Sequence, residues 1–254
     1  MAPDVYPETA KSSTPAALLS WSLVIPVKVL AQAKSRLTGL TGTARSDLAL
    51  AMAADTITAA TAAATVATVL VVTDDPAVTE IATGLGALVL PDVPAAGLND
   101  ALAYGAAHAQ ARWPERGRAG LAGDLPAARP EELTAALAAA ARLGAAFVPD
   151  ADGTGTVLYA AAPGAEFRPR FGPGSRNRHL ATGAAEIGPA EIVATARIDA
   201  PAEQDAPAEQ TALAGLRRDV DTVNDLRRAA ELGLGQRTRA VLLADARILS
   251  SSAS

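Results

Sequence analysis

Two acidic segments that are far apart in the sequence carry side chains suited to binding a divalent cation. Asp124 follows a short apolar stretch, and Asp219 and Asp221 lie in the segment RRDVDTVNDL at 217–226. Mg²⁺ is usually held by one or two protein carboxylates together with substrate phosphates, so few protein ligands are needed. In an extended segment, Asp219 and Asp221 would share one face. The alternatives are a turn or cap position for Asp124 and a helix N-cap for Asp221, and the spacing does not decide between them.

Three cations follow the first strongly apolar stretch of the chain. Lys28, Lys34 and Arg36 lie within IPVKVLAQAKSRL at 25–37. A cationic loop after a buried strand is suited to binding a triphosphate, whereas the alternative is solvated charge on an ordinary surface loop. The sequence contains neither a Walker motif nor Gly-x-Gly-x-x-Gly, so it predicts neither a P-loop nor a Rossmann cofactor site.

Two glycine-rich loops follow later, GTGTVLY at 153–159 and FGPGSRNRH at 171–179. Glycine-rich turns expose backbone N–H groups, and Thr156 and Ser175 add hydroxyls. The arginines of the second loop add positive charge near a predicted helix start, where anions are favoured. We interpret the two loops as a cradle for a second phosphorylated molecule, although Gly-Pro-Gly is also common in ordinary loops.

The composition excludes several kinds of chemistry. The 254 residues include no cysteine and two histidines, and the net charge is −5. Disulfides, Cys–zinc sites, iron–sulfur clusters and a thiol nucleophile are therefore excluded. His108 and His179 have no visible partner and are assigned no catalytic role. No serine lies in a Gly-x-Ser-x-Gly setting, so a hydrolase triad is not supported. The mild acidity argues against a broad nucleic-acid-binding surface.

No stretch reaches the roughly 18 uninterrupted apolar residues of a membrane-spanning helix. The nearest resemblance to a signal peptide is AALLSWSLVIPV at 16–27. It is preceded by Asp4 and Glu8, where a signal peptide has basic residues. Its second half is rich in β-branched residues, which favours a buried strand. We therefore expect a cytoplasmic protein without a membrane partner.

Strands and helices are predicted to alternate along the first part of the chain. Strands are predicted at 23–27, 66–73, 87–90 and 118–123. Helices are predicted at 43–64, from Pro76, from the GLND loop to about Trp113, and at 130–144. This alternation predicts an α/β fold with a doubly wound, mostly parallel sheet. In such sheets ligands bind at the carboxyl ends of the strands, where the candidate residues lie.

The remaining sequence is less regular. Strands are predicted at 145–150, 155–161 and 191–199, and a closing helix at 221–235. The segment 200–215 contains a near-repeat of APAEQ and is predicted to be a mobile surface insertion. We predict one domain at 21–235, a flexible N-terminal tail at 1–20, and a C-terminal tail at 236–254 with no assigned element.

Seven motifs, taken together and in order, resemble one family. They are VIPVKxxxxAKSRL at 24–37, LVVTDD at 70–75, GLNDAL at 97–102, GDLP at 123–126, GTGT at 153–156, FGPGSRNRH at 171–179 and DVDTVNDL at 219–226. Over 22–233 the chain resembles the phosphoenolpyruvate / 2-phospho-L-lactate guanylyltransferases of coenzyme F-420 biosynthesis. Each motif alone is weakly specific, whereas seven in this order are strongly specific.

The resemblance implies a fold and a reaction. The fold would be the nucleotidyltransferase version of the doubly wound α/β sheet, which is GT-A-like and similar to nucleotide-diphospho-sugar transferases. The reaction would join GTP to a three-carbon phosphorylated acid and release pyrophosphate, with one or two Mg²⁺ ions. The product would be an enolpyruvoyl- or lactyl-diphospho-5'-guanosine, which could be handed over to the next enzyme of the pathway.

The resemblance also implies a role for each candidate residue. Those expected to act on the GTP phosphates are Lys28, Lys34 and Arg36. Those expected near the guanine are the backbone of Ile25, Pro26 and Val27, together with Asn99. Those expected to hold Mg²⁺ are Asp124 and Asp221, with Asp219. Those expected to bind the acid are Thr156, Gly172 and Ser175.

This chemistry needs no general base. The attacking group would be a phosphate oxygen, which is already anionic at neutral pH, so the lack of a histidine or serine nucleophile is expected. The site must instead neutralise charge at the α-phosphorus and align two anions, which cations do by positioning and electrostatics.

Other functions stay open on the sequence alone. A related nucleotidyltransferase could use another nucleotide, such as CTP, or another acceptor, such as 3-phosphoglycerate or a sugar phosphate. A non-catalytic protein that senses GTP is the alternative from a different class, but a sensor needs no second substrate pocket. Phosphoenolpyruvate and 2-phospho-L-lactate fit equally well, as do a monomer and a homodimer.

Overall fold

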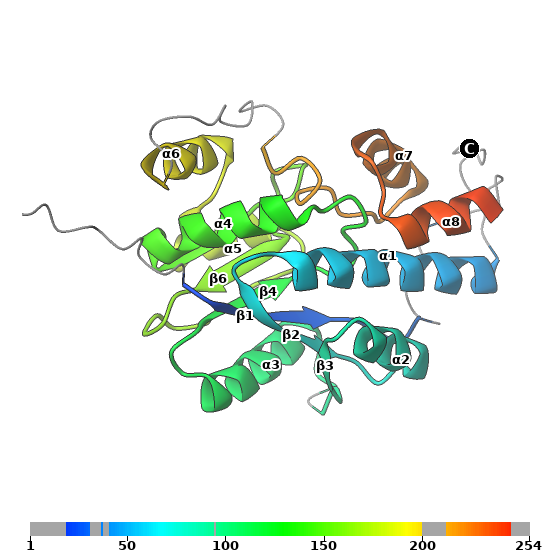
Figure 1. Cartoon of the computed structure of the whole chain (residues 1–254), viewed down its shortest axis with the longest axis horizontal. Coiled ribbons are helices and arrows are strands. Elements are labelled where there is room, and N and C mark those ends of the chain that lie inside the picture. The colour runs from blue at the N-terminus through cyan, green and yellow to red at the C-terminus, as the bar shows by residue number, and fades with distance from the viewer. Residues whose placement is uncertain (1–18, 31–36, 38–40, 94, 200–211, 245–254) are drawn as a thin grey trace, which may run out of the picture.

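The computed structural model describes residues 19–30, 37, 41–93, 95–199 and 212–244 (Figure 1). The predicted N-terminal tail up to 18, most of the predicted insertion and the last ten residues lie outside the described residues. Two of the three predicted phosphate-binding cations, Lys34 and Arg36, also lie outside them.

The described residues form one seven-stranded sheet with the strand order β3-β2-β1-β4-β6-β5-β7. The strands are β1 Trp21–Pro26, β2 Val66–Val72, β3 Leu88–Leu90, β4 Gly117–Leu121, β5 Ala145–Val148, β6 Leu158–Ala161 and β7 Ala185–Glu186. Every neighbouring pair is parallel except the two pairs that β6 makes with β4 and β5. The predicted α/β fold with a mostly parallel sheet is therefore confirmed.

Eight helices connect or flank these strands within the described ranges. They are α1 Gly42–Ala62, α2 Pro76–Gly84, α3 Leu98–Arg112, α4 Pro130–Leu143, α5 Ser175–Ala181, α6 Pro189–Asp199, α7 Val223–Leu232 and α8 Gln236–Ala244. Figure 1 shows α1 and α4 on one side of the sheet and α3 on the other. Among the described helices, none combines the length and the apolar character that crossing a bilayer requires.

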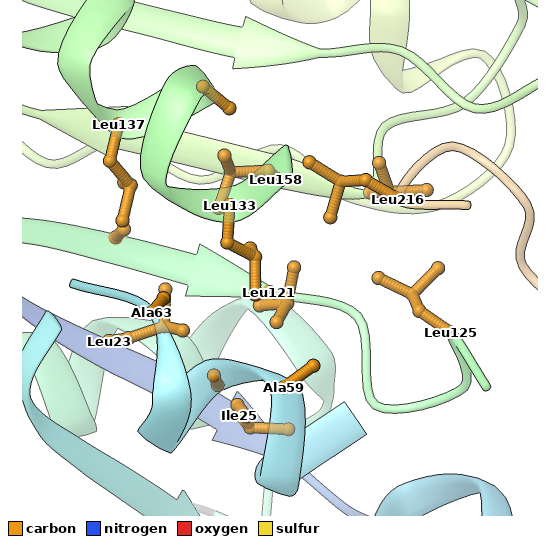
Figure 2. Close-up of a cluster of buried hydrophobic side chains, with 14 of the residues drawn as sticks. Leu23, Ile25, Ala59, Ala63, Leu121, Leu125, Leu133, Leu137, Leu158 and Leu216 are labelled. Atoms are coloured by element: carbon orange, nitrogen blue, oxygen red, sulfur yellow. The ribbon is translucent and has the colours of Figure 1, made fainter. Parts of the chain in front are cut away.

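The central strands are buried on both faces, as a parallel sheet covered by helices requires. Leu23 and Ile25 of β1 pack into the cluster that contains the apolar residues of α1 and α4 (Figure 2). Val24, which lies between them, packs into the cluster under α3. Because successive side chains of a strand point to opposite faces, a near-continuous apolar run fills both layers.

Close approach explains why the central strand β4 is rich in glycine. A Cβ at Gly120 would lie 2.6 Å from Leu102 of α3, and one at Gly117 would lie 2.7 Å from Cδ2 of Trp21. A side chain at either position would push α3 or the indole away from the sheet. The glycines that lower the strand propensity of this segment therefore allow its neighbours to pack against it.

A third apolar cluster joins the C-terminal part of the chain to α1. It contains Leu48 and Met52 of α1, Leu226 of α7 and Leu242 of α8. The carboxylate of Asp55 in α1 accepts hydrogen bonds from the backbone N–H groups at the start of α8, at 2.8 Å from Thr238 and 3.1 Å from Arg237. The sequence assigned no element beyond 235, whereas the packed structure continues through α8.

One prediction about the region after 188 is wrong, and a second is contradicted only at the end that the structure describes. The segment 191–199 is part of helix α6 and not a strand. Its buried residues Ile192 and Thr195 are three positions apart, which is the spacing of a helix face. The described end of the predicted mobile insertion is packed and not a surface loop, because Ala212 and Leu213 are buried in the main core.

Candidate active site

The strand topology brings residues from several strands to one edge of the sheet. The parallel strands β1 and β4 end there, and β6, which is antiparallel, begins there with Leu158 opposite Leu121. A hydrogen bond of 2.8 Å from the N–H of Ala122 to the carbonyl of Val157 extends this pairing. Asp124 after β4 and Thr156 before β6 therefore lie at the same edge, although the sequence separates them by a helix and a strand.

A backbone hydrogen bond brings the second acidic segment to Asp124. The N–H of Val220 donates to the carbonyl of Asp124 at 3.1 Å, and the side chain of Val220 is buried in the third cluster. Asp219 and Asp221, on either side of Val220, both line a cavity beside Asp124. The helix N-cap of α7 is Thr222, so the N-cap alternative for Asp221 is excluded, and Asp124 does not cap α4, whose N-cap is Arg129.

Two adjoining cavities meet at the two aspartates. A cavity of about 360 Å³ is lined by Pro26, Val27 and Lys28 after β1, and we call it the β1 cavity. A cavity of about 660 Å³ is lined by the two glycine-rich loops, and we call it the loop cavity. Four residues line both of them: Leu98, Ala122, Asp124 and Asp221. Groups bound in the two cavities would therefore meet at Asp124 and Asp221.

The β1 cavity contains part of the set predicted for the nucleotide. Lys28 is exposed at its rim. The side chain of Ile25, whose backbone is predicted to lie near the guanine, is buried in the main core with no exposed surface and is not part of the cavity wall. The small side chains of Ala49 and Ala53 on α1 form part of the wall, and they leave space that a larger residue would fill.

The side chain of Asn99, which is predicted to lie near the guanine, is hydrogen-bonded to the protein backbone. Its side-chain N–H donates to the carbonyl of Phe171 at 3.1 Å, and its carbonyl oxygen accepts from the N–H of Phe171 at 2.7 Å. Its amide thus pairs with the backbone of the second glycine-rich loop, and Asn99 is not among the residues that line either cavity. The structure therefore gives Asn99 the role of holding this loop against α3.

All three residues predicted for the acid line the loop cavity: Thr156, Gly172 and Ser175. Gly172 has φ +110°, a backbone conformation that side chains strongly disfavour. The hydroxyl oxygen of Ser175 is buried and has no hydrogen-bond partner among the described residues. A buried hydroxyl without a partner is costly, and a ligand in this cavity can supply the missing bond.

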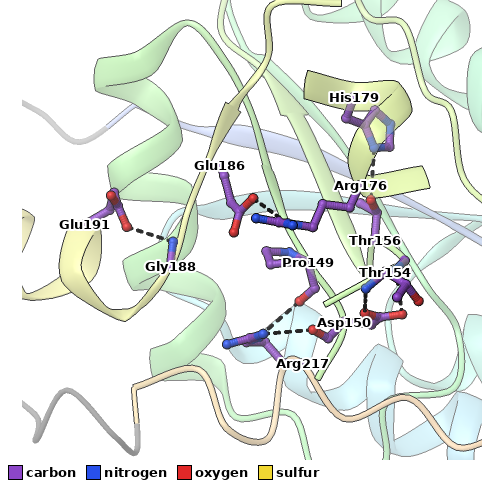
Figure 3. Close-up of polar contacts among 11 residues, drawn as sticks. Pro149, Asp150, Thr154, Thr156, Arg176, His179, Glu186, Gly188, Glu191 and Arg217 are labelled. Carbon is purple, nitrogen blue, oxygen red and sulfur yellow. Dashed lines mark hydrogen bonds and ion pairs between the residues drawn. The ribbon is translucent and has the colours of Figure 1, made fainter. Parts of the chain in front are cut away.

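Asp150 orders the first glycine-rich loop. Its two carboxylate oxygens accept the N–H groups of Thr154 at 2.9 Å and Gly155 at 2.8 Å (Figure 3). A Cβ at Gly155 would lie 3.0 Å from Cγ of Asp150. The GTGT motif therefore needs glycine at 155 so that the loop can fold around this carboxylate.

Arg218 is a candidate functional residue that sequence reasoning missed. Arg218 is the positively charged residue among the described residues that line the loop cavity. Its Nε is buried without a hydrogen-bond partner among the described residues, and its Nη1 lies 3.9 Å from the largely exposed Asp152. The signal in the sequence is the Arg-Arg pair directly before Asp219, which places two cations next to the acidic segment.

The carboxylates fit a divalent cation. Burial, and then the charges of Asp124, Asp150 and Asp221, raise the pKa of Asp219 to about 7. Carboxylate oxygens, several of which lie close together here, are the kind of ligand that Mg²⁺ prefers. Among the described residues, no three Asp, Glu, His or Cys side chains by themselves form a metal-binding group. Phosphate oxygens would therefore have to complete the coordination, as is usual for Mg²⁺.

Comparison with known proteins places this geometry in a family. Residues 21–188 match the family described as "Guanylyl transferase CofC like". The phosphoenolpyruvate guanylyltransferase of Thermomonospora curvata is 51% identical over 88% of this chain and 89% of its own. That of Streptomyces coelicolor is 48% identical over 88% and 96%, and that of Salinispora arenicola is 51% identical over 86% and 91%.

A solved structure supports the fold. A protein described as a nucleotide-diphospho-sugar transferase, from Desulfovibrio desulfuricans G20, superposes with a TM-score of 0.60 over 91% of this chain and 98% of its own, at 15% identity. This likeness shows the fold and nothing about the substrate. The family match and the relatives at about half identity go further, and they show that the chain belongs to the CofC-like guanylyl transferase family.

Proposed function

We propose that this enzyme transfers the guanylyl group of GTP to the phosphate of phosphoenolpyruvate and releases pyrophosphate. One observation carries the proposal: Asp124 and Asp221 line both the β1 cavity and the loop cavity. A reaction between two phosphorylated molecules needs two pockets that meet at a site able to neutralise charge. A protein that only sensed GTP would need one of them.

The names of the relatives favour phosphoenolpyruvate as the acceptor, because each relative reported above is called a phosphoenolpyruvate guanylyltransferase. The product would be enolpyruvoyl-diphospho-5'-guanosine, formed in the biosynthesis of coenzyme F-420. The second candidate acceptor is 2-phospho-L-lactate, which carries the same carboxylate and phosphate.

The residues of the chain would act by positioning two anions. Lys28 at the β1 cavity would bind the triphosphate, while Arg218, Ser175 and Thr156 would hold the acceptor. A phosphate oxygen of the acceptor would then attack the α-phosphorus in line with the departing pyrophosphate. One new P–O bond forms and one breaks, and no proton has to be removed from the attacking oxygen.

Asp124 and Asp221, with Asp219, would hold Mg²⁺ in this proposal. The ion would supply charge neutralisation for the attacking and leaving oxygens. The chain's own contribution is to place Asp124 and Asp221 at the junction of the two cavities, with Asp219 beside them in the loop cavity. It does so through the edge of β4 and through the hydrogen bond from Val220 to Asp124.

Product analysis tests the proposed function. The purified chain is incubated with Mg²⁺, one nucleoside triphosphate (GTP or CTP) and one acid (phosphoenolpyruvate, 2-phospho-L-lactate or 3-phosphoglycerate), and products are identified by mass spectrometry. We expect the guanylylated phosphoenolpyruvate together with pyrophosphate. Turnover only with CTP, or only with another acid, would replace the proposed substrates, and GTP binding without any pyrophosphate release would favour a sensor.

Replacing Ser175 by alanine is expected to raise the KM for phosphoenolpyruvate more than the KM for GTP. Its buried hydroxyl lines the loop cavity and not the β1 cavity. Loss of one hydrogen bond to a charged group corresponds to an increase of about tenfold or more. Pyrophosphate release at varied concentrations of each substrate measures both constants. Equal increases would remove Ser175 from the acceptor site.

Replacing Arg218 by methionine is expected to raise the KM for phosphoenolpyruvate by about ten- to a hundredfold, because methionine keeps the apolar stem and removes the charge-assisted hydrogen bonds. Arg228, which is exposed on α7, provides the matched control, and Arg228→Met should leave both KM values unchanged. An Arg218→Met enzyme with a raised KM for GTP alone would assign the guanidinium to the triphosphate.

A further inference from the structure

His179 is held rigidly beside the loop cavity. Its side chain, on α5, has no exposed surface. The ring stacks on Tyr159, with centroids 4.8 Å apart, and on Phe147, at 5.3 Å, and it packs nearly perpendicular to the ring of Phe171, at 5.8 Å. These aromatic neighbours fix the plane of the imidazole, and with it the direction of both ring nitrogens.

The hydrogen bonds of the ring define which nitrogen carries the proton. Nε2 lies 2.8 Å from the backbone nitrogen of Arg170, and a backbone N–H can only donate. Nε2 must therefore accept, and in a neutral imidazole the hydrogen is then on Nδ1. Nδ1 lies 2.9 Å from Oγ1 of Thr156 (Figure 3), so the histidine donates to the threonine.

The ring is neutral at physiological pH. Burial, and then the positive charges of Arg178 and Arg170, lower the pKa of His179 to about 4. A proton added to Nε2 would also face the N–H of Arg170, which would then lose its acceptor. The single neutral form with hydrogen on Nδ1 is therefore the one that the surroundings select.

This arrangement determines what the hydroxyl of Thr156 can offer. A hydroxyl has one hydrogen to donate and two lone pairs. The Nδ1–H group of His179 donates to one lone pair of the Thr156 hydroxyl. Among the described residues, His179 is the hydrogen-bond partner of this hydroxyl. The hydroxyl hydrogen is therefore left for a partner in the loop cavity, which Thr156 lines together with the unpartnered hydroxyl of Ser175.

We propose that His179 is a positioning residue of the acceptor site, which fixes Thr156 as a hydrogen-bond donor to the acceptor's anionic group. The same ring accepts from Arg170, directly before the loop of Phe171, Gly172 and Ser175, and so holds the other wall of the cavity. The proposal rests on the proposed function in one respect, namely that the loop cavity takes a phosphorylated acid. His179 touches no substrate and is not a catalytic residue.

Two amide substitutions separate the two contacts of the ring. Asparagine places an N–H group near the position of Nδ1 and can still donate to Thr156, whereas glutamine reaches the position of Nε2 and can still accept from Arg170. We expect His179→Gln to raise the KM for phosphoenolpyruvate by about tenfold, with little change in the KM for GTP. His179→Asn should recover most of this loss. Equal effects of the two variants on both KM values would show a purely structural role.

A double-mutant cycle tests whether His179 acts through Thr156. Thr156→Val keeps the shape of the side chain and removes its hydroxyl. If the histidine acts through that hydroxyl, adding His179→Gln to Thr156→Val should raise the KM for phosphoenolpyruvate no further. Independent effects whose free energies add would overturn the proposal.

NMR of the free protein tests the geometry without any substrate. The chain has two histidines, so a His108→Gln variant assigns the ring signals of the other. The ¹⁵N shifts of His179 should show hydrogen on Nδ1 and none on Nε2, and Thr156→Val should shift the Nδ1 signal more than the Nε2 signal. Hydrogen on Nε2 would overturn the proposal even if the variants fail to fold.

The wild-type assay and the two His179 variants together distinguish failure of this proposal from failure of the proposed function. If the wild type releases no pyrophosphate with GTP and any of the three acids, both fail. If the wild type is active but the glutamine and asparagine variants are indistinguishable, the proposed function stands and the role of His179 does not.

Discussion

Replacing Asp124 by asparagine is expected to lower the rate of pyrophosphate release by about a hundredfold to a thousandfold, the usual cost of removing one group that stabilises charge in the transition state. Asparagine keeps the size of the side chain but offers a neutral oxygen in place of a carboxylate. Asp124 is one of the two acidic residues that line both cavities. Its charge therefore acts where the two phosphorylated substrates meet, and we expect this substitution to have the largest effect on activity.

The measurement is the initial rate of pyrophosphate release at a series of Mg²⁺ concentrations, with circular dichroism to confirm folding. Removing divalent ions from the wild type with a chelator should abolish the activity, and adding Mg²⁺ back should restore it. Asp47 is exposed on α1, and Asp47→Asn serves as the control with the same chemical change. An Asp124→Asn enzyme that is folded and nearly as active as the wild type would refute the metal-binding role.

Replacing Gly215 by alanine should damage both stability and activity. A Cβ at this position would lie 2.9 Å from the carbonyl carbon of Ala127 and 2.9 Å from Oε2 of Glu132, and closer still to the carbonyl oxygen of Ala127. Glu132 also accepts the N–H groups of Gly215 and Leu216, each at 2.9 Å. This contact holds the segment that leads to Asp219 and Asp221.

Overpacking of this kind typically costs about 1–3 kcal/mol, and we expect Gly215→Ala to reach the upper end of that range because the added methyl group meets backbone on one side. Urea unfolding measures the free energy of unfolding, and pyrophosphate release measures the loss of activity in the folded fraction. A Cβ added at Gly84 would meet no atom within 4 Å, and Gly84 has no strained φ, so Gly84→Ala should be at least as stable as the wild type. Wild-type behaviour of Gly215→Ala would show that the segment tolerates displacement.

The elements with strong local signals could be predicted from the sequence. The apolar, β-branched run of β2 ends in four buried residues, and α4 begins with Pro130 and two glutamates and ends before Gly144. Where the local pattern was ambiguous, the predicted secondary structure was wrong or no element was assigned. The run at 191–199 alternates well enough for a strand, but Pro189 begins α6 and Glu191 accepts the N–H of Gly188 at 2.9 Å. Helix α8 depends on Asp55, a partner from α1 that no local pattern reveals.

The sequence by itself determined which residue types were available: two acidic segments, three cations after the first strand and two hydroxyl-bearing glycine-rich loops. Only the tertiary structure decided which of them meet. Asp124 and Asp221 line the same two cavities because Val220 is held by a backbone hydrogen bond to Asp124 and by its buried side chain. Thr156 reaches the loop cavity because β6 runs antiparallel to β4. The same folding gives Arg218 a place in the loop cavity and gives His179 its two partners. These contacts join segments far apart along the chain, whereas periodicity and motif spacing report only on residues that are close in the sequence. For this physical reason, the sequence could predict which residues belong to the site but not how they are arranged in space.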